Sequence, residues 1–198
     1  MTKKMGVAIA VLAFALMLGC GKAPETEMMN AESAIKAAGE AEAEQYAPQD
    51  YQMAMDTLNA AKTEAETQAS KFALFRSYGK AKKLYESAQS LADNALAKST
   101  SEKERISAEV ADMMESVKTL LDSASTAVSK APLGKGSKAD IELIKADLKA
   151  AYTAFDEAKV DFENSRYLNA RAKLEAVNQK SKAIINEIHK AASMKKSK

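Results

Sequence analysis

The sequence contains one cysteine, one histidine, no tryptophan, three prolines and seven glycines. A lone cysteine cannot form a disulfide within the chain, so the fold must be stabilised by packing. A lone histidine, His189, excludes a histidine-rich metal site and the paired Glu-x-x-His motifs of di-iron helix bundles. Because helix breakers are few and alanine is abundant, the composition predicts an all-α protein.

An excess of charge of one sign is also missing. Lys3 and Lys4 account for the net charge of +2, so residues 20–198 are neutral overall. A general nucleic-acid binder needs a basic face, and we therefore expect no nucleic-acid partner. The last residues, 195–198, form a basic tail that we interpret as solvated, with lipid headgroups or acidic glycans as the alternative. Peptidoglycan is a further candidate partner without a supporting motif.

The N-terminus has the features of a processed export signal. Two lysines precede an apolar run over 6–18, which is shorter than the roughly 20 residues needed to span a bilayer. The run ends in LMLGC (residues 16–20), which resembles a bacterial lipobox: Gly19 fits the pattern, whereas Met17 replaces its usual leucine. The resemblance implies that 1–19 is removed and that Cys20 carries lipid, such as palmitate. The alternative is an ordinary secretory signal that leaves Cys20 as a free thiol.

A lipoprotein resemblance has consequences for location. One acyl chain binds a membrane weakly, whereas the three chains of a lipoprotein give a stable anchor. In enteric bacteria an aspartate after the cysteine retains a lipoprotein in the inner membrane, and here that position is Gly21. The resemblance therefore implies an anchor in the inner leaflet of the outer membrane, with the protein facing the periplasm.

Apolar residues recur at alternating spacings of three and four in five segments. The predicted helices cover 31–46, 51–69, 78–130, 141–162 and 167–191. One narrow apolar seam on each helix is typical of coiled coils and antiparallel bundles. We therefore predict an all-α fold of elongated antiparallel hairpins with about five long helices. The expected organisation is a tether over 20–30, an N-terminal unit over 31–98, a C-terminal unit over 99–194 and the basic tail.

The polar run KSTSEKER (98–105) leaves the middle of the chain ambiguous. It contains no glycine or proline, which favours one continuous helix over 78–130, shared by both units. Ser101 and Glu104 fit a capping box, which favours a new helix start. We favour continuity.

The two halves have similar turns. RSYGKAKKLYESA, from Arg76, and NSRYLNARAKLEAV, from Asn164, both place a tyrosine three residues before an alanine. Duplication and convergence of alanine-rich helices both explain this similarity.

The first unit resembles the envelope family called domain of unknown function 4398 over residues 29–97. Tyr46-Ala47-Pro48, Tyr51, Leu58, Tyr78 and Ala81 carry the match. Members are often lipoproteins with an alanine-rich helix, a Tyr-Ala-Pro turn and two further helices. The family name implies no activity.

We find no catalytic constellation and expect no cofactor, metal site or catalytic residue. His189 has no predicted acid or nucleophile beside it, and the stretch 134–137 (GKGS) lacks the strand and glycine spacing of a phosphate loop. Six aromatic residues lie near the seams and either pack the core or line a ligand pocket. They are Tyr78, Tyr85, Tyr152, Phe155, Phe162 and Tyr167.

These observations favour a non-enzymatic structural or adaptor lipoprotein, with a protein partner or self-association. The alternative is a ligand-binding or transport accessory with a pocket between hairpins. Large apolar residues in 141–191 predict a well-packed hairpin that serves as an interaction module, and we expect Arg166 and Lys173 to lie on its surface.

Overall fold

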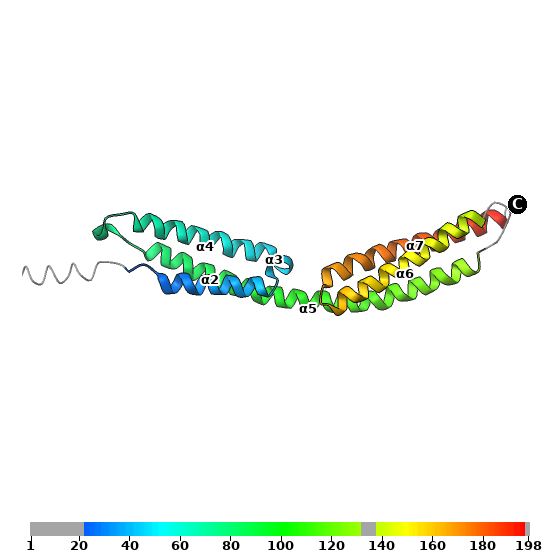
Figure 1. The fold of residues 1–198 in the computed structure, drawn as a ribbon, viewed down its shortest axis with the longest axis horizontal. Helices are drawn as coiled ribbons and strands as arrows, with labels where there is room; N and C mark the ends of the chain where they lie inside the picture. The colour runs from blue at the N-terminus through cyan, green and yellow to red at the C-terminus, as the bar shows by residue number, and fades with distance from the viewer. Residues whose placement is uncertain (1–21, 132–137, 197–198) are drawn as a thin grey trace, which may run out of the picture. The chain divides into compact units, whose positions relative to one another are not determined.

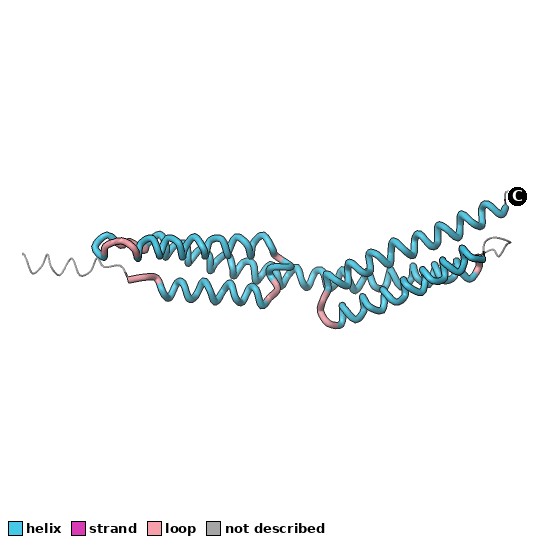
Figure 2. The backbone as a smooth tube through the Cα atoms, turned by 45° about the horizontal axis from the view of Figure 1, so that its top comes forward, coloured by secondary structure: helices cyan, strands magenta, loops and turns pink. Residues whose placement is uncertain are grey.

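The computed structural model describes residues 22–131 and 138–196, and within them the chain is helical without strands. The elements are α2 (Glu25–Glu40), α3 (Ala43–Tyr46), α4 (Pro48–Ala69), the short 3-10 helix η1 (Ala73–Phe75), α5 (Gly79–Ser129), α6 (Lys138–Glu163) and α7 (Tyr167–Lys196) (Figures 1 and 2). The all-α prediction is confirmed. Contacts divide the chain between Glu102 and Lys103 into two units, which we call unit 1 and unit 2.

Helix α5 runs without a break through the ambiguous segment, from Gly79 to Ser129. The hydroxyl groups of this segment bond to backbone carbonyls: Thr100 Oγ1 donates to Leu96 O at 3.0 Å, and Ser99 Oγ donates to Ala41 O. The polar run therefore stays helical, and Ser101 does not begin a new helix. Since Ser99 bonds to Ala41, it belongs to unit 1 and not to the C-terminal unit predicted to begin at residue 99.

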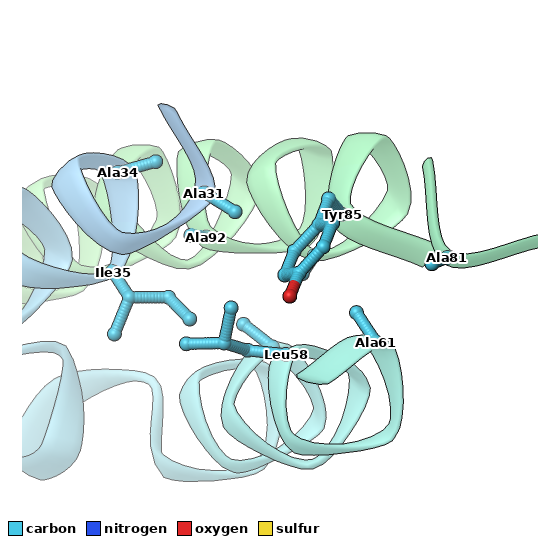
Figure 3. Packing of buried hydrophobic residues seen from close by; sticks show 10 residues of the cluster. Ala31, Ala34, Ile35, Leu58, Ala61, Ala81, Tyr85 and Ala92 are labelled. Carbon is cyan, nitrogen blue, oxygen red and sulfur yellow. The ribbon is translucent and has the colours of Figure 1, made fainter. Parts of the chain in front are cut away.

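Unit 1 is built from α2, α4 and the first half of α5. Its core joins all three helices, and Figure 3 shows Ile35, Leu58 and Tyr85 directed into the space between them. Apart from these three residues the main cluster consists of alanine. Its members are Ala31, Ala34, Ile35, Ala54, Leu58, Ala61, Ala81, Tyr85, Ala88 and Ala92.

The start of unit 1 corrects the predicted tether. Helix α2 begins at Glu25, so residues 25–30 are helical and the segment before them is shorter than expected. Two contacts explain the earlier start: Met28 packs against the core, and Glu27 pairs with Lys82 of α5. Acidic residues in a first helical turn are also favoured by the helix dipole.

The predicted helix over 31–46 is interrupted in the structure. Helix α2 ends at Glu40, Glu42 takes a left-handed conformation with φ of 60°, and α3 follows. The Ala41 carbonyl, freed by this break, accepts the hydrogen bond from Ser99. A tertiary contact therefore compensates for the break, and the sequence pattern alone does not reveal it. Pro48 then starts α4, because proline suits the first helical position.

Unit 2 is built from the second half of α5 with α6 and α7. Its buried apolar residues are mostly large and are supplied by all three helices: Ile106, Val110, Val117, Leu121, Ala124, Val128, Ile141, Ile144, Leu148, Ala151, Ala158, Ala170, Leu174, Val177, Ile184 and Ile188. In α5 the buried seam uses Leu121 and Val128, whereas the neighbouring Leu120 and Ala127 are only partly buried. A straight helix has 3.6 residues per turn, so a strict 3.5-residue seam drifts and a step of four corrects it.

The last helix of unit 1, which is the first half of α5, and the last helix of unit 2, α7, bury residues at the same spacing along the chain. Counted from Tyr78, which directly precedes α5, and from Tyr167, the first residue of α7, buried residues follow at the same steps of three and four. The corresponding pairs are Ala81 and Ala170, Tyr85 and Leu174, Ala88 and Val177, Ala92 and Ser181, Ala95 and Ile184, and Ser99 and Ile188. The similarity of the two turns therefore continues along both helices.

Candidate functional site

The predicted lipidation residue, Cys20, lies outside the described residues. The first described residue is Lys22, two positions later, and it leads through Pro24 into α2. Residues 22–27 line a surface depression together with residues 76–79 and Lys82 at the start of α5. The described start of the chain therefore lies at the end of unit 1 where α4 turns into α5 (Figure 1).

An ion pair fixes the first turn of α2 at this end. Lys82 Nζ lies 2.8 Å from Glu27 Oε1. The hydrogen bond from Lys82 lowers the pKa of Glu27 below its usual value, and the same bond raises the pKa of Lys82. Both groups are therefore charged at neutral pH and hold α2 against α5.

The turn from α4 to α5 is tied down by the buried side chain of Gln68. Its Oε1 accepts hydrogen bonds from Lys71 Nζ and from the backbone N–H of Ser77, each at 3.1 Å. Its Nε2 donates to Glu64 Oε1 at 2.8 Å, and Glu64 also pairs with Lys80 at 2.8 Å. The bonds from Lys80 and Gln68 lower the pKa of Glu64. One network thus holds both ends of the turn.

Residues 71–76, which we call the apolar turn, present large apolar side chains to solvent. Phe72, Leu74 and Phe75 are 70%, 62% and 75% exposed. The two phenyl rings lie 6.4 Å apart between centroids. Arg76 Nε donates to Lys71 O at 2.9 Å, so the basic residues at the two ends of the turn are joined.

The apolar turn was not predicted from the sequence. Its signal was the run FALF between two seams, where the three-four spacing stops and a polar turn is the usual expectation. Lysine and arginine on either side of that run were a second signal. Exposed apolar side chains that gather in one place mark interaction sites more often than scattered ones.

A buried carboxylate joins α6 to α7 in unit 2. Arg166 Nη2 lies 2.6 Å from Asp161 Oδ1, and Lys173 Nζ lies 2.9 Å from Asp161 Oδ2. Lys173 also pairs with Glu157 at 3.2 Å. Hydrogen bonds from Lys173 and Arg166 lower the pKa of Asp161. Arg166 and Lys173 lie outside the buried seam, as expected, but each also compensates the charge of a buried carboxylate.

The predicted aromatic set does not gather around one cavity. Tyr78 and Tyr85 are buried in unit 1, and burial raises the pKa of Tyr85. Phe162 and Tyr167 stack near the α6–α7 turn with ring centroids 5.4 Å apart, and Tyr152 Oη donates to Asp122 Oδ1 at 3.3 Å. Phe155 is half-buried on α6. These contacts assign packing roles to the aromatic residues.

The other residues considered from the sequence, His189, the stretch 134–137 and the C-terminal tail, form no site in the described part of the chain. His189 is exposed on α7, and residues 134–137 lie outside the described part of the chain. Helix α7 continues to Lys196, so the predicted tail at 195–198 is helical in its first two residues. In residues 22–131 and 138–196 no group of three or more His, Cys, Asp or Glu side chains could hold a metal ion. No helix in the same part of the chain is long and apolar enough to cross a membrane.

Residues 26–111 match the family model described as Domain of unknown function (DUF4398). The match begins in α2, covers most of the described part of unit 1 and ends within α5, in unit 2. The predicted DUF4398 resemblance over 29–97 is thereby confirmed. Among the curated proteins and the solved structures, no chain matches this one.

Proposed function

We propose that the protein is a lipoprotein of the bacterial cell envelope that acts as a non-enzymatic helical adaptor. Lipid on Cys20 anchors it in the inner leaflet of the outer membrane, and both units face the periplasm. The DUF4398 region in unit 1 lies next to the anchor, and unit 2 engages a protein partner or a second copy of the chain.

The position of the only cysteine carries this proposal. Cys20 follows an apolar run over 6–18 that begins after two lysines, and helix α2 begins at Glu25, after four intervening residues. A cysteine placed by chance would rarely end an apolar signal segment and also directly precede a folded helical module. The spacing suits a lipid anchor, which needs only a short link between membrane and fold.

The filled interiors of the units support an adaptor over a ligand carrier. The largest fully buried side chains include Tyr85, Leu121 and Leu174, which occupy the seams where a ligand pocket was the alternative. The depression beside Tyr78 opens to solvent and is lined partly by charged residues, including Glu27 and Lys82. Apolar ligand sites are enclosed and mostly apolar, so this surface favours the adaptor.

Substitution of the cysteine tests the anchor. Cys20→Ala should abolish incorporation of labelled fatty acid and move the protein from the membrane fraction to the soluble fraction after signal cleavage. Cys20→Ser is a second variant that keeps a polar side chain of similar size. Unchanged acyl labelling in both variants would refute the lipoprotein proposal.

Exposed apolar residues on α6 offer a test of the adaptor role. Leu143 and Val160 are 69% and 50% exposed. If unit 2 contacts a partner through α6, Leu143→Ser with Val160→Ser should reduce crosslinked complexes in intact envelopes while helicity stays unchanged. Lys149→Ser, at an exposed position on the same helix, is the matched control. Equal crosslinking of all variants would remove this face of α6 from the proposal.

A further inference from the structure

We propose that the apolar turn of unit 1, residues 71–76, inserts into the surface of a lipid bilayer. The inference rests on the proposed function for one point, that this bilayer is the membrane holding the lipid on Cys20. The insertion would give the protein a second membrane contact and would fix the orientation of unit 1 on the membrane.

The apolar turn has the composition of a membrane-interface contact. Phe72, Leu74 and Phe75 expose most of their surface, and none of the three belongs to the buried clusters of unit 1. The turn is held by the hydrogen bonds of Gln68 and by the Arg76–Lys71 bond, so its shape does not depend on burying these side chains. A fixed apolar tip inserts with little further loss of conformational entropy.

Chain length places the proposed anchor beside this turn. Two residue steps separate Cys20 from Lys22, and an extended chain covers about 3.6 Å per residue, so the cysteine lies within about 7 Å of Lys22 along the backbone. Lys22 and Arg76 line the same depression, and Arg76 directly follows Phe75. Lipid on Cys20 would therefore bring the bilayer surface to the end of unit 1 that carries the apolar turn.

The basic residues beside the apolar turn favour a lipid bilayer as its binding partner. Lys71 and Arg76 flank the apolar side chains, and their described hydrogen bonds go to neutral acceptors, the Gln68 side chain and the Lys71 carbonyl. The nearby carboxylates of Glu27 and Glu64 form their ion pairs with Lys82 and Lys80, and the charge of Lys71 makes only a smaller contribution at Glu64. Basic residues around an aromatic tip attract anionic headgroups while the rings enter the interface, as in interfacial membrane contacts.

Because the sequence contains no tryptophan, the fluorescence of a single introduced tryptophan reports on one chosen position. We would prepare residues 20–198 with Cys20→Ser and without lipid, carrying Phe75→Trp as the only tryptophan. A matched protein would carry Leu143→Trp, because Leu143 is 69% exposed in unit 2 and Phe75 is 75% exposed in unit 1. Both would be titrated with vesicles of phosphatidylcholine, with and without phosphatidylglycerol.

We expect Trp fluorescence of Phe75→Trp to shift to shorter wavelength with vesicles and to be quenched by lipids brominated on their acyl chains. Phosphatidylglycerol should strengthen the binding, and salt should weaken it. Leu143→Trp should respond little. Adding Phe72→Ser and Leu74→Ser to the Phe75→Trp protein should weaken vesicle binding by about tenfold or more, because apolar contact with the membrane is lost. Circular dichroism should show unchanged helicity.

Three results would overturn the proposal. Fluorescence of Phe75→Trp that is unaffected by both vesicle types would exclude insertion. Equal quenching of Phe75→Trp and Leu143→Trp would indicate nonspecific adsorption. A wavelength shift that depends on protein concentration without vesicles would assign the turn to self-association.

The vesicle experiment is independent of lipidation, because its protein has no cysteine. If Cys20→Ala leaves acyl labelling unchanged while Phe75→Trp inserts into vesicles, the proposed anchor fails and the membrane-binding turn stands. If labelling is lost while Phe75→Trp does not respond to vesicles, the anchor stands and the inserted turn fails.

Discussion

The two units fill the same seam register with different residues. At corresponding positions of α5 and α7, unit 1 has Ala88 and Ala95 where unit 2 has Val177 and Ile184. Small seam residues allow helices to approach closely, whereas larger ones bury more apolar area per residue. The comparison shows that the three-four pattern specifies which face of a helix is buried but does not set how much stabilisation that face provides.

Polar contacts between helices also differ. Unit 1 has four described ion pairs that cross between its helices: Glu27–Lys82, Glu32–Lys62, Asp50–Lys98 and Glu64–Lys80. Unit 2 also has ion pairs between its helices, Glu109–Arg171, Glu157–Lys173 and Asp147–Lys180, and in addition directs Arg166 and Lys173 to one buried carboxylate, Asp161. Since exposed ion pairs are screened by solvent and contribute little to stability, unit 1 depends strongly on its few large core residues.

The largest expected effect tests this dependence at Tyr85. Tyr85→Ala should destabilise unit 1 by about 3–5 kcal/mol, because it removes the largest fully buried side chain from a seam of alanines. Urea denaturation followed by circular dichroism measures the change. Tyr85→Phe keeps the ring and should cost much less. Similar losses for both variants would show that ring packing does not stabilise unit 1.

Corresponding substitutions in unit 2 should be slightly milder individually. Leu148→Ala or Ile184→Ala should each cost about 2–5 kcal/mol, depending on how far neighbouring large side chains fill the gap. Leu143→Ala, at an exposed position of α6, is the control and should change the free energy of unfolding by less than about 0.5 kcal/mol. Equal stability of core and control variants would contradict the packing of α6 with α7.

Exchanging seam residues sharpens the comparison. Ala88→Val introduces into unit 1 the residue that unit 2 has at the corresponding position, Val177. It should destabilise by about 1–3 kcal/mol, because the added methyl groups overpack a seam already filled by alanine. Val177→Ala should also destabilise, by leaving a gap. If Ala88→Val raises the melting temperature, the alanine seam is underpacked and our view of unit 1 is wrong.

Two buried serines should respond in opposite directions. Ser99 donates its hydroxyl to Ala41 O, whereas the buried Oγ of Ser181 has no hydrogen-bond partner among the described residues. Ser99→Ala should therefore destabilise by about 1 kcal/mol, and Ser181→Ala should stabilise by a similar amount. Thermal melting of both variants measures the difference. Destabilisation by Ser181→Ala would show that its hydroxyl is satisfied in solution.

The smallest effect concerns pH. The pKa of Asp161 is lowered on folding, so its contribution to stability is present above the unfolded value of about 4 and is lost as pH falls through the folded pKa. Asp161→Asn should reduce the acid sensitivity of unit 2, and Arg166→Ala should reduce stability at neutral pH. Melting temperatures measured from neutral to acidic pH test both expectations. An unchanged acid profile in Asp161→Asn would exclude this carboxylate as its source.

The pattern of spacing predicted much of the fold because burial of a helix face follows directly from periodicity. Ala81, Tyr85, Ala88, Ala92 and Ala95, which follow the three-four spacing of the predicted helix over 78–130, are buried, and α4 ends at the predicted residue, Ala69. Periodicity could not show that Asp161 forms ion pairs with Arg166 and Lys173. From spacing alone, a carboxylate beside the seam is expected on the surface, and only the folded structure shows which basic side chains lie next to it. The apolar turn was missed for a related reason, since exposure is a property of the folded chain.

The sequence by itself determined the helical class, the five long helices, the seam faces and the candidate anchor at Cys20. These follow from local propensity, periodicity and a short linear motif, all of which act over a few residues. Tertiary structure decided the break at Glu42, the pairing of Ser99 with Ala41 and the exposure of Phe72, Leu74 and Phe75. Those features depend on which distant side chains fill the space around them, and only the packed helices bring those side chains together.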